Sequence, residues 1–300
     1  MCKFSRHAPV ALALMLGFLS TSCLIKGRRT IKRGGVAASQ AKPLLAASRD
    51  DLNSRIAASY NAIQSFQATV ELSASVGSVY KDKITDYQDV RAYVLFRKLS
   101  DMRLIGKLPV VGTTAFDMVS TGGAFRLSLP TKNRFITGEN GAPATSKNPI
   151  ENLRPYALLS SMMIKPLDAE TELMFLEDDT DEKDAFYVLH FVRKGADGSL
   201  LVLRAVWFDR VTLAIVRQRE YDDDALITSD THYKNWTNYN GISFPANIDI
   251  TRPKDGYGVT MAVEAMKINL PLADASFILN QPPDAQLQVL GAAAVKENIK

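Results

Sequence analysis

The stretch SRDDLNSRIAASYNAIQSFQATVELSASV, residues 48–76, changes its hydrophobic period halfway and decides the fold of the chain. In its first half, apolar side chains recur every three or four residues: Leu52, Ile56, Tyr60 and Ile63. This is the period of an amphipathic helix, and Ser48 is a favourable N-cap residue. From Phe66 to Val76, apolar and polar residues alternate as in a half-exposed strand. The stretch therefore predicts a helix over 48–65 and then a strand.

More strand-like segments follow in two runs. The first run comprises residues 88–98, 101–108, 114–120, 123–129 and 133–138. The second run comprises residues 185–194, 200–208, 211–221, 226–238, 242–251 and 257–269. Turn dipeptides such as Asp197-Gly198 and Asn240-Gly241 separate them, and such short connections join neighbouring antiparallel strands. About eleven or twelve strands are expected.

A helical insertion is predicted between the two runs, at about residues 145–180. Its apolar residues indicate one or two short helices, interrupted at Pro155. Asp168 is expected to cap a further helix that ends at Leu176, followed by an acidic loop over 177–184. The fold class is therefore α+β, with most of the chain in antiparallel sheet.

The N-terminus resembles a bacterial lipoprotein signal. Lys3 and Arg6 precede a short apolar run, and small residues lead to Cys23. Residues 1–22 are therefore predicted to be removed and Cys23 to be acylated, anchoring the chain to a membrane. The alternative is an ordinary signal peptide with an incidental cysteine. Because Cys2 leaves with the signal, the folded part has no thiolate metal site.

Charge divides the mature chain into a basic tether and an acidic body. Nine of the 36 Lys and Arg residues precede Asp50, whereas all 32 acids lie at or after it, so the body carries 27 basic and 32 acidic residues. Residues 23–47 are predicted to be the lipidated cysteine and a flexible tether that can contact anionic lipid. The acidic body predicts no binding of nucleic acid.

No pattern in the chain is typical of catalysis or metal binding. His190 and His232 lie in predicted strands, where a hydrogen-bonded sheet histidine is the expected role. The acidic clusters at 178–184 and 222–224 lack the spacing of a calcium-binding loop, and no Gly-x-Ser-x-Gly motif is present. We therefore expect neither an enzyme, nor a metal site, nor a cofactor.

The connection between the predicted strands 101–108 and 114–120 is unusually apolar. It carries Pro109, Val110 and Val111 where a polar turn is expected. Two interpretations remain open. The turn inserts its valines among acyl chains of a membrane, or it folds back so that the valines cover the core.

The order of helix, meander, helical insertion and second meander, with the lipoprotein signal, resembles the LolA/LolB lipoprotein-localisation family. The nearer resemblance is to LolB, the outer-membrane lipoprotein acceptor, in which a protruding turn presents a bare leucine. Residues 108–114 occupy the matching place. Residues 123–130 and 240–245 resemble that family's small strand and late hairpin, which both end in proline. The resemblance covers about residues 48–280 and leaves 281–300 as a C-terminal tail.

The resemblance implies an open half-barrel whose apolar concave face is covered by helices. It implies a protein that is lipid-anchored at the outer membrane, faces the periplasm, and binds acyl chains of lipoproteins or lipids to help them reach the membrane. Leu24, where aspartate retains lipoproteins at the inner membrane, agrees with that location. Pro109, Val110 and Val111 would form the membrane-insertion or acyl-transfer turn.

Leu158, Met162 and Met163 would form a lid over the cavity, because methionine adapts to irregular apolar shapes. Plain helix core is the alternative for these three residues. A periplasmic carrier of the LolA type is the implied partner. The alternative function is a non-catalytic structural or regulatory lipoprotein that uses the same sheet as a binding platform, with a packed interior.

Overall fold

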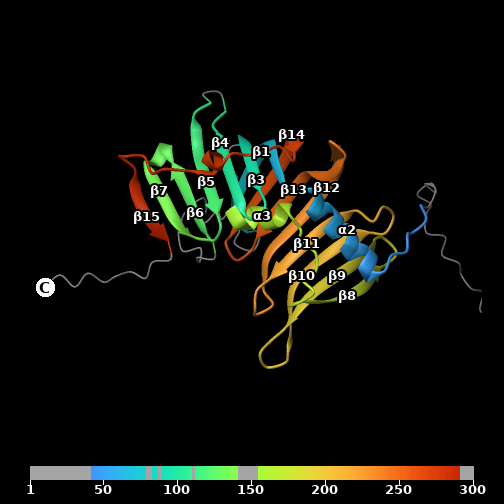
Figure 1. The fold of residues 1–300 in the computed structure, drawn as a ribbon. Coiled ribbons are helices and arrows are strands. Elements are labelled where there is room, and N and C mark those ends of the chain that lie inside the picture. Colours follow the sequence, from blue (N-terminus) through green and yellow to red (C-terminus); the bar gives the residue numbers. More distant parts are fainter. Residues whose placement is uncertain (1–41, 79–82, 87–88, 110–111, 141–154, 291–300) are drawn as a thin grey trace, which may run out of the picture. The chain divides into compact units, whose positions relative to one another are not determined.

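Fifteen strands dominate the part of the chain that the structure describes, which comprises residues 42–78, 83–86, 89–109, 112–140 and 155–290 of a computed structural model (Figure 1). The first seven are β1 (Ser65–Ser78), β2 (Lys83–Asp86), β3 (Val90–Arg97), β4 (Asp101–Lys107), β5 (Thr114–Thr121), β6 (Ala124–Leu129) and β7 (Arg134–Glu139). The others are β8 (Leu173–Thr180), β9 (Ala185–Lys194), β10 (Leu200–Asp209), β11 (Ile215–Tyr221), β12 (Ile227–Tyr239), β13 (Ile242–Arg252), β14 (Tyr257–Ile268) and β15 (Gln286–Leu290).

All fifteen described strands belong to one open sheet. Its order is β15-β7-β6-β5-β4-β3-β1-β14-β13-β12-β11-β10-β9-β8, and β2 pairs with β1 beside this path. Neighbours pair antiparallel, except that β15 is parallel to β7. The pairing of β1 with β14 joins the two meanders, while β15 and β8 end the sheet. The predicted open antiparallel sheet is confirmed.

β1 lies near the centre of this sheet, and its residues alternate between buried and more exposed positions. Phe66 and Val70 are buried, whereas Glu71 between the inward positions is exposed. The strand register sets Phe66 opposite Phe96 of β3 and Ile268 of β14, and both partners are buried as well. Because alternate residues of paired strands point to the same face, one face of the sheet becomes apolar.

Two helices cover that apolar face. α2 (Arg49–Ala62) begins after Ser48, whose side chain accepts a hydrogen bond from the Asp51 backbone while the Asp51 carboxylate accepts one from the Ser48 backbone. α2 contacts β8, β9 and β13, and α3 (Pro155–Met162) contacts β4, β5, β12 and β13 (Figure 1). The large buried apolar side chains of both helices join the same core as the sheet: Leu52, Ile56, Leu158, Leu159 and Met162. No helix in the described ranges is long and apolar enough to cross a membrane.

The opposite face of β5 carries a smaller, separate core. Met118 belongs to the large core and its neighbour Val119 to the small one, and successive strand residues face opposite sides. The short 3-10 helix η4 (Asp274–Phe277) packs there through Phe277, and the Ser276 carbonyl accepts a hydrogen bond from Arg103. The chain after β14 thus returns across the outer face of the sheet.

The helical insertion differs from its prediction at its C-terminal end. α3 is described from Pro155 onward. The part of the insertion before Pro155 lies outside the described residues, so the predicted interruption at Pro155 stays a prediction. The helix predicted to end at Leu176 is absent from the described chain, because Asp168 caps only a turn through Glu170 and Thr171. Residues 173–180 form the edge strand β8 instead. The acidic loop is therefore shorter than predicted.

Besides β8, two more strands were not predicted. β2 pairs with the end of β1, and β15 extends the sheet beyond residue 280, where a tail was expected. β15 was missed because it is short and mostly exposed, so its pattern shows little hydrophobic alternation. It is nevertheless held by five register positions against β7, from Gln286 opposite Arg134 to Leu290 opposite Gly138.

Candidate functional site

The concave face of the sheet is lined by a continuous apolar core. Its largest fully buried side chains come from strands distant in sequence: Phe66, Phe96, Phe125, Phe191 and Phe208. The core continues onto α2 through Leu52 and Ile56 and onto α3 through Leu158. An apolar concave face closed by two helices therefore exists, as the resemblance implied.

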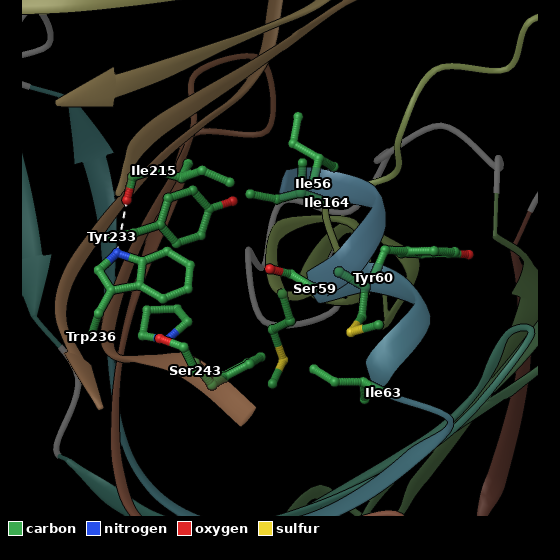
Figure 2. A pocket seen from close by; sticks show the side chains of 13 residues that line it. Ile56, Ser59, Tyr60, Ile63, Ile164, Ile215, Tyr233, Trp236 and Ser243 are labelled. Atoms are coloured by element: carbon green, nitrogen blue, oxygen red, sulfur yellow. Dashed lines mark hydrogen bonds between the residues drawn. The ribbon is translucent and has the colours of Figure 1, made fainter. Parts of the chain in front are cut away.

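A narrow cleft lies between α2, the end of α3 and strands β12 and β13 (Figure 2). It is lined by Ile56, Ser59, Tyr60, Ile63, Met162, Met163, Ile164, Ile215, Tyr233, Trp236, Ser243, Phe244 and Pro245. Figure 2 shows Ile56 and Ser59 of α2 on the side of the helix that faces Tyr233 and Trp236. The Trp236 indole donates a 2.8 Å hydrogen bond to the Ile215 carbonyl. The cleft measures about 30 Å³, room for one or two water molecules. The interior is thus closed in this structure.

The three residues predicted to form a lid lie together on this closed face. Leu158, Met162 and Met163 are 1%, 5% and 6% exposed. Met162 and Met163 line the cleft, while Leu158 packs into the main core. Their burial fits both interpretations, a lid at rest and plain helix core, since a closed lid is packed like core.

The other side of α3 carries a row of polar contacts that was not predicted from the sequence. The Tyr233 hydroxyl donates to the Ser161 carbonyl at 2.8 Å, and the Thr231 hydroxyl donates to the Ser161 hydroxyl at 3.0 Å. The adjacent Ser160 hydroxyl donates to the Glu220 carboxylate at 3.2 Å. A small number of hydrogen bonds therefore holds the end of α3 against β11 and β12.

These polar residues occupy inward positions of their strands. Gln218 and Glu220 alternate with Arg217 and Arg219, whose guanidinium groups pair instead with Asp230. The period-two pattern places Gln218 and Glu220 on the same face of β11, but it does not show that this face is buried. They were not predicted because polar residues on a strand are usually exposed.

A second hollow opens beside this polar row. It measures about 320 Å³ and is lined by Tyr156, Ser160, Met163, Lys165, Glu172, Leu203, Arg204, Gln218, Glu220, Tyr221 and Thr228. Arg204 forms an ion pair with Glu172 at 2.7 Å, and the two side chains are 11% and 12% exposed. We call this hollow the polar pocket. Met163 lines both it and the apolar cleft, so the two spaces lie on either side of one side chain.

Burial changes the proton affinity of two groups in this region. It raises the pKa of the Glu220 carboxyl, although the Ser160 hydrogen bond and the charges of Arg252, Arg204 and Lys165 act in the opposite direction. It also raises the pKa of the Tyr233 hydroxyl well above 10, and the nearby Glu220 charge adds to that effect. Tyr233 therefore acts as a neutral hydrogen-bond donor.

The predicted insertion turn is described only at its flanks. Leu108 and Thr113 close its base, with the Leu108 N–H donating to the Thr113 carbonyl at 2.9 Å. Pro109 is exposed, and Gly112 is exposed with a φ of +64°. Val110 and Val111 lie outside the described residues, as does Cys23. Their predicted roles stay predictions.

The histidines are held by their neighbours. His190 Nε2 lies 2.7 Å from the Glu177 carboxylate, and its ring stacks on Phe175 at 4.6 Å. His232 lies 3.5 Å from Asp230. In the described ranges, no three His, Cys, Asp or Glu side chains gather as a metal would require.

Comparison with known proteins places this fold among LolA-like structures. A DUF1329 family protein from Desulfovibrio piger shares 16% identity at a TM-score of 0.52, over 77% of this chain and 95% of its own. A LolA superfamily protein from Nitrosomonas europaea shares 14% identity at a TM-score of 0.50, over 78% of this chain and 99% of its own. A putative outer membrane lipoprotein-sorting protein domain from Vibrio parahaemolyticus shares 12% identity at a TM-score of 0.50, over 77% of this chain and 95% of its own.

The comparisons establish the fold and leave the function open. No family model matches the chain, and no curated protein does either. The LolA-like open sheet with two covering helices agrees with the predicted fold class. None of the three structures is described as LolB, so the nearer resemblance to LolB stays a prediction.

Proposed function

We propose that this protein binds single acyl chains of lipoproteins or lipids on its concave face and helps deliver them to the outer membrane, to which acylated Cys23 anchors it. The protein faces the periplasm, has no enzymatic activity, and receives cargo from a carrier of the LolA type. The LolA-like fold supports this proposal, and the similar Vibrio domain is described as a putative lipoprotein-sorting protein.

One observation carries the proposal. A large apolar concave face is closed by helices rather than by further strands, and a cleft already separates α2 from Met162 and Met163. The cleft is far smaller than the roughly 300–1,000 Å³ of small-molecule sites. Acyl binding therefore requires the end of α3 to move off the sheet. The acyl chain would then replace the contacts that α3 makes with the core.

The two tryptophans allow this to be tested without a label. Trp236 lines the cleft, whereas Trp207 lies under the guanidinium groups of Arg217 and Arg219, 5.2 and 5.5 Å from its ring. Residues 24–300 carrying Trp207→Phe report from Trp236 alone, and those carrying Trp236→Phe report from Trp207 alone. Titration with a long-chain fatty acid is expected to shift the Trp236 emission saturably, near one chain per protein, and to leave Trp207 unchanged.

A second function is supported by the packed interior. A filled core with a cleft of about 30 Å³ is what a non-catalytic binding platform would show. Absence of saturable acyl binding in the same titration would favour this platform and exclude the carrier.

Delivery would involve the turn at Pro109, Val110 and Val111. Burying one valine among acyl chains contributes about 1.5 kcal/mol or more. Val110→Asp is therefore expected to leave acyl binding unchanged and to slow transfer of the bound chain to vesicles. Equal transfer by the Val110→Asp variant and the original protein would favour the interpretation in which the valines cover the core.

A further inference from the structure

Two side chains that line the polar pocket each carry a buried polar atom without a partner in the described part of the chain, one an acceptor and the other a donor. Among the described residues, no donor reaches Gln218 Oε1 and no acceptor reaches Arg204 Nε. Gln218 is 2% exposed, and both residues line the pocket. A buried acceptor without a donor costs free energy, as does a buried donor without an acceptor. Such groups commonly mark a place where a ligand or water completes the hydrogen bonds.

The orientation of the Gln218 amide follows from its neighbours. Its Nε2 faces the Ser160 carbonyl at 3.5 Å and the Glu220 carboxylate at 3.3 Å. Both are acceptors, so exchanging the amide nitrogen and oxygen would set oxygen against oxygen. The unsatisfied atom is therefore the carbonyl oxygen, which requires a donor from the ligand.

Arg204 is likewise fixed in place. Its two terminal nitrogens bind Glu172 at 2.7 and 2.8 Å, and one of them also reaches the Pro166 carbonyl at 3.1 Å. Its guanidinium lies over the Phe191 ring at 3.9 Å. The Nε–H is thus a preorganised donor that requires an acceptor.

We infer that the polar pocket binds a polyol headgroup, such as the glycerol or sugar of a lipid. A hydroxyl is both donor and acceptor, so the hydroxyls of a polyol can supply a donor to Gln218 Oε1 and an acceptor to Arg204 Nε. An ammonium group offers only donors, and a phosphate dianion offers only acceptors. The pocket volume of about 320 Å³ lies at the lower end of the range for small-molecule sites.

The inference rests on the proposed function and names its substrate class. Met163 separates the apolar cleft from the polar pocket. An amphiphile whose chain entered beside α2 could therefore place its headgroup across Met163, in the polar pocket. Specificity would then arise from the headgroup, while the apolar face supplies affinity for any chain.

Competition against a fluorescent acyl probe tests this on residues 23–300 carrying Cys23→Ser. The competitors share one chain length: dodecanoyl glycerol, dodecyl glucoside, methyl dodecanoate, dodecylammonium and dodecyl phosphate. The two polyols are expected to bind about tenfold more tightly than the methyl ester, as one or two net hydrogen bonds allow. Tight binding of only one polyol would support the site and identify its source.

Gln218→Met removes the acceptor at similar size, and it is expected to abolish the polyol preference, measured as the ratio of polyol affinity to methyl ester affinity. The exposed Gln286 gives a matched control, Gln286→Met, which should keep the preference. Equal binding of all competitors, tightest binding of the ammonium or phosphate, or a preference that survives Gln218→Met would overturn the polyol site but leave acyl binding intact. Binding of no competitor and no probe would overturn both.

Discussion

Glu220 carries a carboxyl group that is largely removed from water beside α3. Its pKa is raised above the ordinary value of 4.5 because burial disfavours the charged form. The folded state therefore binds this proton more tightly than the unfolded state. Stability from this group is fully present below about pH 4.5 and is lost as the pH rises through the raised pKa.

Glu220→Gln is therefore expected to stabilise the protein at pH 7. The gain should be on the order of 1 kcal/mol and should vanish as the pH falls below 4.5, where the glutamate is protonated in both states. The Ser160 hydroxyl can accept from the new amide instead of donating. Urea unfolding at several pH values measures this. A variant that is less stable than the original protein at pH 7 would show that Glu220 is held there by its cationic neighbours.

The ion pair of Arg204 with Glu172 is the second feature that matters at this scale. Arg204→Met leaves the Glu172 carboxylate buried and unpaired, which should cost about 3 kcal/mol or more in the free energy of unfolding. The double variant Arg204→Met/Glu172→Leu should recover most of that loss. Arg193→Met is the control, since its pair with Asp223 is exposed and should contribute less than about 1 kcal/mol. Urea unfolding of all three decides the comparison.

At the scale of elements, α3 combines an apolar underside with a few hydrogen bonds at its end. Tyr233→Phe removes the donor to the Ser161 carbonyl and should lower stability by about 1 to 2 kcal/mol. Because the closed position of α3 is weakened more than the open one, acyl affinity should rise, by up to about tenfold.

The control for Tyr233→Phe is Tyr239→Phe on the same strand, outside the row that contacts Ser161. It should leave acyl affinity unchanged. Fluorescence titration alongside thermal unfolding measures both quantities. A loss of affinity in Tyr233→Phe, instead of a gain, would mean that the Tyr233 hydroxyl contacts the bound chain.

Elements with a clear period were predictable, and those without one were not. The change of period between Ile56 and Phe66 predicted α2 and β1, because burial of one face leaves a regular pattern in the sequence. β8 has both faces largely exposed, so its sequence shows no such pattern, and the capping residue Asp168 suggested a helix. β15 depends on pairing with a strand about 150 residues earlier, which no local pattern encodes.

The candidate site was predictable only in its apolar part. Leu158, Met162 and Met163 lie in an apolar stretch of the insertion, which predicts their burial, and their role as a lid stays a prediction. Gln218, Glu220 and Ser160 were not predictable, since their burial arises only when α3 meets β11 and β12. Polar residues on a strand are usually solvent-exposed, and their alternation alone does not distinguish a buried row from an exposed one.

At the scale of the whole molecule, two meanders share one apolar face because β1 pairs with β14. This pairing brings the first and the penultimate strands together and places the inward residues of both meanders under the same two helices. The resulting interior is closed and nearly filled. The proposed acyl binding therefore depends on one movement, that of α3 away from β12.

A reversible disulfide tests that movement most directly. The Ser161 and Thr231 hydroxyl oxygens lie 3.0 Å apart, so cysteines at these positions bring their sulfurs within bonding reach. Residues 24–300 contain no other cysteine, and each single variant serves as a control. Oxidised Ser161→Cys/Thr231→Cys is expected to bind no acyl probe, and reduction should restore saturable binding. Equal binding by the oxidised and reduced proteins would contradict the account, because the chain would then bind without displacing α3.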